Sequence, residues 1–136
     1  MGTLLPEGLN NSIATRLNAC VTQARKATPD ELVVQSSQHL EAARFAHSKD
    51  PLVDIQLAEA LHVAITRLFA DWDRVPRHVR PWCKGMVAYF VSPTDNQHDW
   101  RSCVGFDDDA EVINACLRMA DREDLCVNPE ETDGAG

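Results

Sequence analysis

The sequence predicts an all-α fold, a small bundle of about five helices that run mostly antiparallel. Three observations predict it: apolar residues recur at three- and four-residue steps, helix-start signals precede these segments, and alternating β-branched runs are almost absent. The length of 136 residues, with 44% apolar and 25% charged residues, is typical of one globular domain with a buried core. We therefore expect a single helical domain over residues 1–127 and an acidic, flexible tail over residues 128–136.

The first two helices are predicted from Pro6 to Lys26 and from Thr28 to about Lys49. In the first helix Asn10 and Asn11 weaken the initial turns. One face of this helix carries Ile13, Leu17, Cys20, Val21 and Ala24. The second helix begins in Thr28-Pro29-Asp30-Glu31, which combines a cap hydroxyl, a proline at the first helical position and a glutamate three residues after the cap. Its apolar positions are Leu32, Val33, Leu40, Ala43 and Ala46.

The third helix is the element with the clearest pattern. Asp50-Pro51 repeats the cap-then-proline signal. The apolar residues that follow at helical spacing are Leu52, Ile55, Ala58, Leu61, Ile65, Leu68 and Phe69. His62 of this helix has no second histidine four residues away, so its position favours the edge of a core over metal binding.

Two further helices complete the predicted bundle. The fourth runs from about Pro81 to Val91 and ends before Ser92-Pro93, because a residue that precedes proline avoids the helical conformation. A loop or short turn follows over residues 92–106. The last helix opens in the run from Asp107 to Asp109. Its apolar stripe is Val112, Ile113, Cys116, Leu117 and Ala120.

The densest polar cluster lies between these last two helices, and two interpretations of it remain open. It comprises Asp95, His98, Asp99, Asp107, Asp108 and Asp109. In one interpretation Asp95, Asp99, Asp108 and Asp109 converge on a divalent cation such as Mg²⁺ or Ca²⁺, and His98 admits a softer metal. In the other, which residue preferences favour, Asp108 caps the last helix with Glu111 three residues later, and Gly105 permits a left-handed backbone before the cap.

Composition and charge exclude several classes of function. The net charge of −8 repels phosphate backbones, so we expect no nucleic-acid partner. The longest apolar run, residues 86–91, is too short to span a membrane. Five widely spaced cysteines and the lack of a secretory signal predict reduced thiols and a cytoplasmic location. The basic stretch from Arg74 to Lys84 is either a solvated turn or a docking patch for an acidic partner.

Signals for catalysis are weak. Cys83, Cys103 or Cys116 could pair with His78 or His98 as nucleophile and base, but no recognised signature surrounds any of these cysteines. The sequence also lacks a phosphate-binding glycine loop and the common hydrolase motifs. An enzyme is therefore the less favoured class, and no catalytic residue or cofactor is predicted apart from the divalent cation of the metal interpretation.

The carboxy-terminal half resembles a known family. The run from Ala88 to Asp95, then Asp99, then the run from Gly105 to Ile113, is similar to the YkvA-like family, a bacterial helical domain of unknown function. The matching positions are Tyr89, Ser92, Pro93, Asp95, Asp99, Gly105, Asp108 and Asp109. The resemblance covers residues 66–120 and implies a helical fold without an established reaction. The family's loop is apolar on either side of Asp99, whereas Gln97, His98, Trp100 and Arg101 make it polar here.

Together these observations predict a non-enzymatic cytoplasmic protein-interaction module. The predicted surface combines the loop over residues 92–109 with the basic stretch over residues 74–84. Its expected binding residues are Trp82, His98, Trp100 and Arg101, because tryptophan and arginine are enriched at interface hot spots. Core packing is an equally good interpretation of the two tryptophans. The alternatives are a metal-binding protein or metal-dependent hydrolase that uses the aspartate cluster, and a homodimer formed through the apolar stripes.

Overall fold

The computed structural model describes residues 9–49, 55–91 and 105–128, and these residues form helices joined by turns. No strand occurs in these ranges, so the predicted all-α class is confirmed. The elements in chain order are α1 (Asn11–Gln23), α2 (Pro29–Lys49), α3 (Ile55–Ala70), the 3₁₀ turn η1 (Trp72–Arg74), α4 (Arg80–Val91), α5 (Gly105–Met119) and the 3₁₀ turn η3 (Glu123–Leu125).

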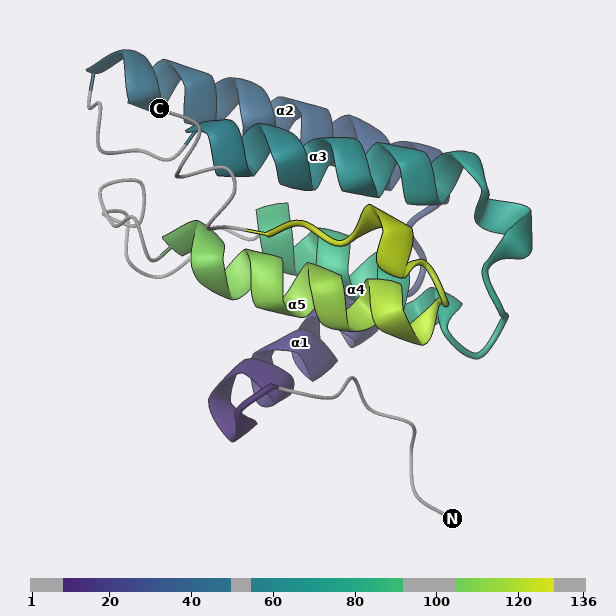
Figure 1. Ribbon diagram of the computed structural model, residues 1–136. Coiled ribbons are helices and arrows are strands. Elements are labelled where there is room, and N and C mark those ends of the chain that lie inside the picture. The colour runs from purple at the N-terminus through teal and green to yellow at the C-terminus, as the bar shows by residue number, and fades with distance from the viewer. Residues whose placement is uncertain (1–8, 50–54, 92–104, 129–136) are drawn as a thin grey trace.

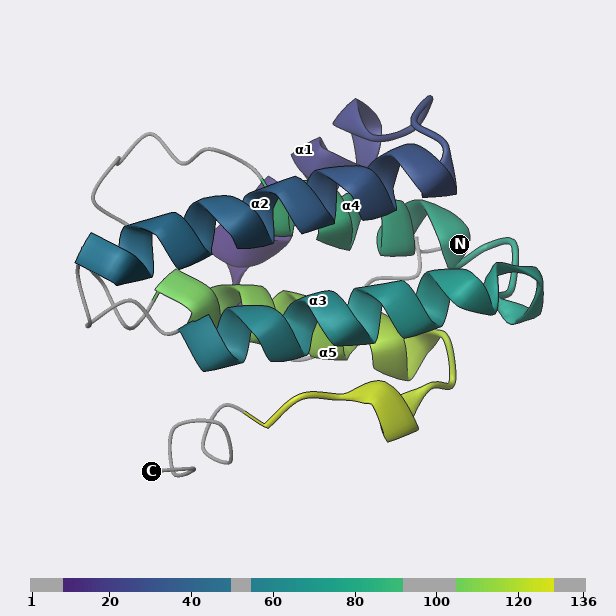
Figure 2. The same ribbon diagram turned by 90° about the horizontal axis from the view of Figure 1, so that it is seen from above.

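The helices are arranged around α4. The antiparallel pair α2 and α3 lies over α4 and α5, and α1 packs against α4 on the side away from that pair (Figures 1 and 2). Eight of the twelve residues of α4 are buried, in a nearly continuous run from Trp82 to Phe90 that only Lys84 interrupts. A helix that is apolar all round must be covered on every side, which explains the central position of α4.

Helix caps explain where the first two helices begin. The Asn10 side-chain oxygen accepts a hydrogen bond from the Ile13 backbone N–H at 2.9 Å. The predicted start at Pro6 is wrong, because Asn10 caps a helix that begins at Asn11 instead of weakening one already under way. For α2 the prediction is confirmed: the Glu31 N–H donates to the Thr28 hydroxyl at 3.1 Å, and that hydroxyl donates to the Glu31 carboxylate.

The start of α5 also differs from the expectation. This helix begins at Gly105, so Gly105 is helical and Asp108 is the fourth residue of the helix. The prediction that Asp108 is the N-cap is therefore wrong, since a capping residue precedes the first helical residue.

The chain beyond α5 folds back on the bundle as far as Val127. Asp121 adopts a left-handed conformation with φ of 61° and reverses the chain. Arg122 then bonds to Asp71 at 3.0 Å and to Asp124 at 3.1 Å. The Asn114 amide donates to the Val127 carbonyl at 2.7 Å and accepts from the Val127 N–H at 2.8 Å. The predicted acidic tail, apart from Asn128, lies outside the described residues.

None of the helices in the described ranges has the length and apolar character needed to cross a membrane.

Candidate functional site

Three of the six residues of the predicted aspartate cluster lie outside the described residues. This holds for Asp95, His98 and Asp99, and also for the expected binding residues Trp100 and Arg101. Among the described residues no group of three or more His, Cys, Asp or Glu side chains could hold a metal ion. The metal site of Asp95, Asp99, Asp108 and Asp109 therefore stays a prediction.

Asp109 is the member of this cluster whose side chain the structure places. It is 9% exposed and points into the bundle, near the amino-terminal end of α5. Burial raises the pKa of the nearby Cys20 thiol, while the charge of Arg16 lowers that pKa and the charge of Asp109 raises it. The Arg16 guanidinium carbon also lies 4.8 Å from the centroid of the Tyr89 ring. One carboxylate thus enters a largely buried contact region between α1, α4 and α5, with a thiol that stays protonated.

The cysteines of α4 and α5 are buried and unsuited to nucleophilic catalysis. Cys83 and Cys116 are both 0% exposed. Burial raises the pKa of Cys83 to about 12, and burial followed by the influence of Cys83 raises the pKa of Cys116 well above its usual value. Because the thiolate is the nucleophile, these two thiols pack as small apolar groups. His78, their suggested base, lies on the exposed turn before α4.

Trp82 lies in the core instead of on the surface. Only 6% of it is exposed, and its backbone carbonyl accepts a hydrogen bond from the Cys116 thiol at 3.5 Å. A partner could reach little of this side chain, so its position agrees with the core-packing interpretation.

Two polar contacts between α2 and its neighbours were not predicted. The Ser36 hydroxyl, which is 0% exposed, lies 2.7 Å from His62 Nδ1 on α3. The His39 ring contacts the Phe90 ring of α4 edge to face, with centroids 4.8 Å apart. Ser36 occupies a position on the apolar stripe of α2, between Leu32 and Leu40, and that spacing is the signal that could have revealed it.

The basic stretch before α4 divides into a structural arginine and several exposed basic side chains. Arg80 donates from Nε to the Val75 carbonyl at 3.0 Å and from a terminal nitrogen to the Trp72 carbonyl at 3.2 Å, which holds η1 against α4. Arg74, Arg77 and His78 are exposed on the turn. Arg80 thus serves the fold, and the choice between a solvated turn and a docking patch concerns the exposed side chains.

Cations from α1 join those of the turn. The Lys84 ammonium donates to the Arg25 carbonyl at 3.5 Å, which brings α4 next to the end of α1. Arg25 and Lys26 are exposed there. We call this surface the basic end and define it by Arg25, Lys26, Arg74, Arg77, His78 and Lys84. It draws on two segments about 50 residues apart in the chain, which the sequence alone did not connect.

The structure describes only the basic part of the predicted interaction surface, because residues 92–104 lie outside the described residues. The turn over residues 74–79 lies at the amino-terminal end of α4, whereas the loop leaves α4 at Val91. A helix of this length separates its two ends by roughly 17 Å. The combination of both segments in one surface stays a prediction.

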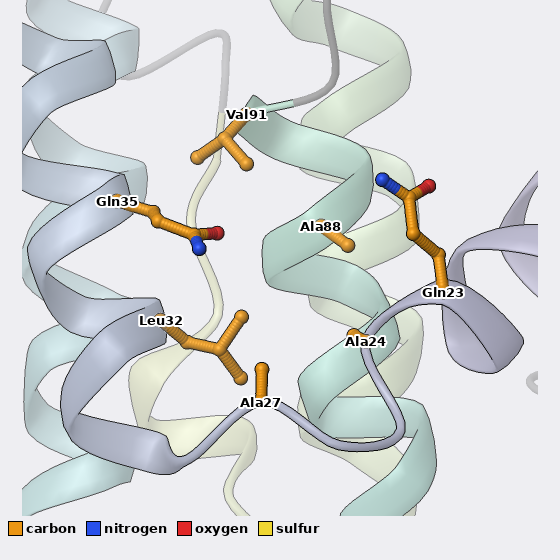
Figure 3. Close-up of a pocket in the computed structure, with 7 residues that line it drawn as sticks. All are labelled: Gln23, Ala24, Ala27, Leu32, Gln35, Ala88 and Val91. Carbon is orange, nitrogen blue, oxygen red and sulfur yellow. The ribbon is translucent and has the colours of Figure 1, made fainter.

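A small pocket opens between the Arg25 and Lys26 part of the basic end and the carboxy-terminal half of α4. It has a volume of about 130 Å³. The α1–α2 connection, α2 and α4 provide its lining, namely Gln23, Ala24, Ala27, Leu32, Gln35, Ala88 and Val91 (Figure 3). Small-molecule sites usually have roughly 300–1,000 Å³. The pocket is thus too small for a typical cofactor or metabolite.

Comparison with protein-family models, with curated protein sequences and with solved structures finds no match to this chain. The resemblance to the YkvA-like family stays a prediction, and the site must be interpreted from its own chemistry.

Proposed function

We propose that this protein is a non-catalytic interaction module that binds an acidic segment of a partner protein at the basic end. The observation that supports this most is the gathering of exposed cations after α1 and on the turn, together with the half-buried Lys84 of α4, on a chain whose net charge is −8. Within the part of the chain that the structure describes, no ion pair involves Arg25, Lys26, Arg74, Arg77 or Lys84.

Arg122 differs from the cations of the basic end because it forms ion pairs within the molecule. Arg122 is at the same end of the bundle but is engaged by Asp71 and Asp124, both close to 3 Å away. Its charge is satisfied within the molecule, and its role is to hold the chain after α5. Among the described residues no carboxylate engages Arg25, Lys26, Arg74, Arg77 or Lys84, and this favours their recognition of carboxylates of a partner.

A protein segment suits this surface better than nucleic acid. The acidic remainder of the molecule repels any long polyanion that extends past the basic end. A short acidic segment avoids most of this repulsion. The tryptophan next to the basic end, Trp72, is half-buried and already stacks on Phe69 with ring centroids 4.7 Å apart, which leaves little of its ring for a nucleic-acid base.

Peptide binding with matched charge reversals tests this proposal. A fluorescent peptide rich in Glu and Asp is titrated with the full-length protein at low salt, and its anisotropy gives the Kd. We expect Arg25→Glu and Arg77→Glu each to weaken binding about fivefold, because each reverses an exposed charge at the site. Lys49→Glu, on the last turn of α2 at the opposite end of that long helix, changes net charge equally and should have little effect.

Equal weakening by all three variants would contradict the proposal, because the effect would then follow net charge alone. So would undetectable binding of the acidic peptide, or tighter binding of a DNA oligonucleotide of equal charge.

A further inference from the structure

We propose that the pocket beside the basic end is an anchor site for one aliphatic side chain of the acidic partner segment. This inference rests on the proposed function and specifies the chemistry of the partner: acidic residues on both sides of a leucine, isoleucine or valine. Three features of the pocket carry it, namely its size, the chemistry of its lining and its position among the charges.

The size of the pocket fits one side chain. Its volume is about 130 Å³. A protein cavity of about 150 Å³ lined by apolar groups accepts one benzene-sized molecule. A branched aliphatic side chain is of similar size, whereas a helix or an indole ring would need more room.

The lining combines an apolar floor with two amides at the rim. Ala24, Ala27, Leu32, Ala88 and Val91 supply the apolar surface. The exposed side chains of Gln23 and Gln35 stand on either side of it (Figure 3). Each amide offers donors and an acceptor, so the pair can bond the backbone N–H and C=O groups on both sides of an inserted residue. A peptide can use these hydrogen-bond donors and acceptors, whereas a purely apolar ligand cannot.

The charges beside the pocket indicate that this peptide is acidic. Arg25 and Lys26 are exposed and lie between two lining residues, Ala24 and Ala27. Lys84 contacts the Arg25 carbonyl. Asp30 and Glu31 lie on the first turn of α2, where their carboxylates interact favourably with the positive end of the helix dipole. Glu31 also accepts a hydrogen bond from the Thr28 hydroxyl. An acidic segment would therefore approach along the α1 and α4 side of the pocket.

The test compares two peptides and two matched variants of the full-length protein. The first peptide has acidic residues on both sides of one leucine, and the second has serine in place of that leucine. We expect the leucine peptide to bind about tenfold more tightly, as the partial burial of one aliphatic side chain implies. Ala27→Leu, which fills the pocket, should remove this preference and leave the salt-dependent binding of the serine peptide intact.

Ala42→Leu is the matched control, since it adds the same side chain at an exposed position of α2 and should keep the tenfold preference. Circular dichroism confirms that both variants fold. Equal affinity of the two peptides for the unmodified protein would overturn the anchor site, whatever the variants do, and would leave charge recognition standing. If neither peptide binds, the proposed function fails as well. Concentration-dependent dimerisation that Ala27→Leu abolishes would assign the pocket to a second copy of this chain and would also overturn the inference.

Discussion

At the scale of single residues, burial decides what the ionisable side chains can do. Cys83 and Cys116 pack as apolar groups because burial disfavours their charged forms. The same physical cause acts on His39, which lies between α2 and α4 against Phe90. The exposed cations of the basic end, by contrast, remain hydrated and can bind a carboxylate of another molecule.

His39 makes the stability of the protein depend on pH in a defined direction. Burial lowers its pKa to about 4 in the folded state, from 6.5. Between these two pH values the unfolded chain binds more protons at this residue than the folded protein does. The contribution of His39 to the free energy of unfolding is therefore fully present above pH 6.5 and is lost as the pH decreases toward 4. The loss from this residue is at most about 3 kcal/mol. Urea unfolding at pH 7 and at pH 4.5 measures it.

A variant that cannot titrate isolates this contribution. His39→Leu keeps an apolar side chain against Phe90 and removes the proton. The difference in unfolding free energy between the two pH values should be smaller in His39→Leu than in the unmodified protein. Burial, and next the charge of Arg44, also lower the pKa of His62, so part of the decline with acid should persist. Identical pH profiles of the two proteins would refute the assignment to His39.

At the scale of elements, the contact between α1 and α4 fixes the position of the basic end. These helices approach closely at Gly85 of α4 and Val21 of α1. A β-carbon added at Gly85 would collide with the Val21 side chain and would lie 3.0 Å from the Val21 α-carbon and 3.1 Å from its nitrogen. Because backbone atoms of α1 line this contact, a small movement of one side chain cannot relieve it.

Gly85→Ala therefore separates helix propensity from packing. Inside a helix, alanine is ordinarily more stable than glycine by about 1 kcal/mol. Here we expect the opposite sign, a loss of about 1–3 kcal/mol, because overpacking forces the helices apart. Thermal or urea unfolding measures the change. Val21→Ala in the Gly85→Ala background should recover only part of the loss, since it removes the side-chain collision and leaves the backbone contact. Increased stability of Gly85→Ala would show that the close approach is wrong.

Local sequence signals predicted the individual helices better than they predicted which helices pack against one another. The Thr28 cap and the periodic stripe of α3 follow from interactions within a few residues, and these predictions are confirmed. The start of α5 was placed too late, because three consecutive aspartates resemble a cap although the helix already runs through them. The apolar positions Leu57 and Ala64 were also omitted, because a helix covered by two neighbours buries a wider face than one stripe.

The candidate site was less predictable than the fold. The turn over residues 74–84 was identified from its charge, but Arg25 and Lys26 join it through the packing of α1 on α4. No local sequence pattern encodes this contact between segments that are distant in the chain. Ser36 and His39 likewise acquire their contacts from helices that are distant in the chain.

At the scale of the whole molecule, the distribution of charge is the feature that suggests function. Thirteen basic residues against twenty-one acidic ones give the chain its negative charge, yet exposed cations gather at one end. A partner segment of opposite sign is steered to that end by the field of the protein, with an association rate that falls as salt rises.

The metal alternative makes a contrasting prediction at the same scale. If Asp95, Asp99, Asp108 and Asp109 hold a divalent cation, a ligand that binds only the folded state must raise the melting temperature. Under the interaction proposal, millimolar Mg²⁺, Ca²⁺ or Mn²⁺ leaves the Tm of the full-length protein unchanged. A Tm increase that Asp95→Asn abolishes would favour the metal site instead.

Nuclear magnetic resonance mapping of the bound peptide tests the central claim most directly. The amide resonances of the labelled full-length protein are recorded while the acidic leucine peptide is added. The account predicts that shifted resonances cluster at residues 23–27, 74–80 and 84–91, together with Gln35 on the facing side of the pocket. Shifts confined to residues 92–109, or shifts spread evenly over the molecule, would contradict it.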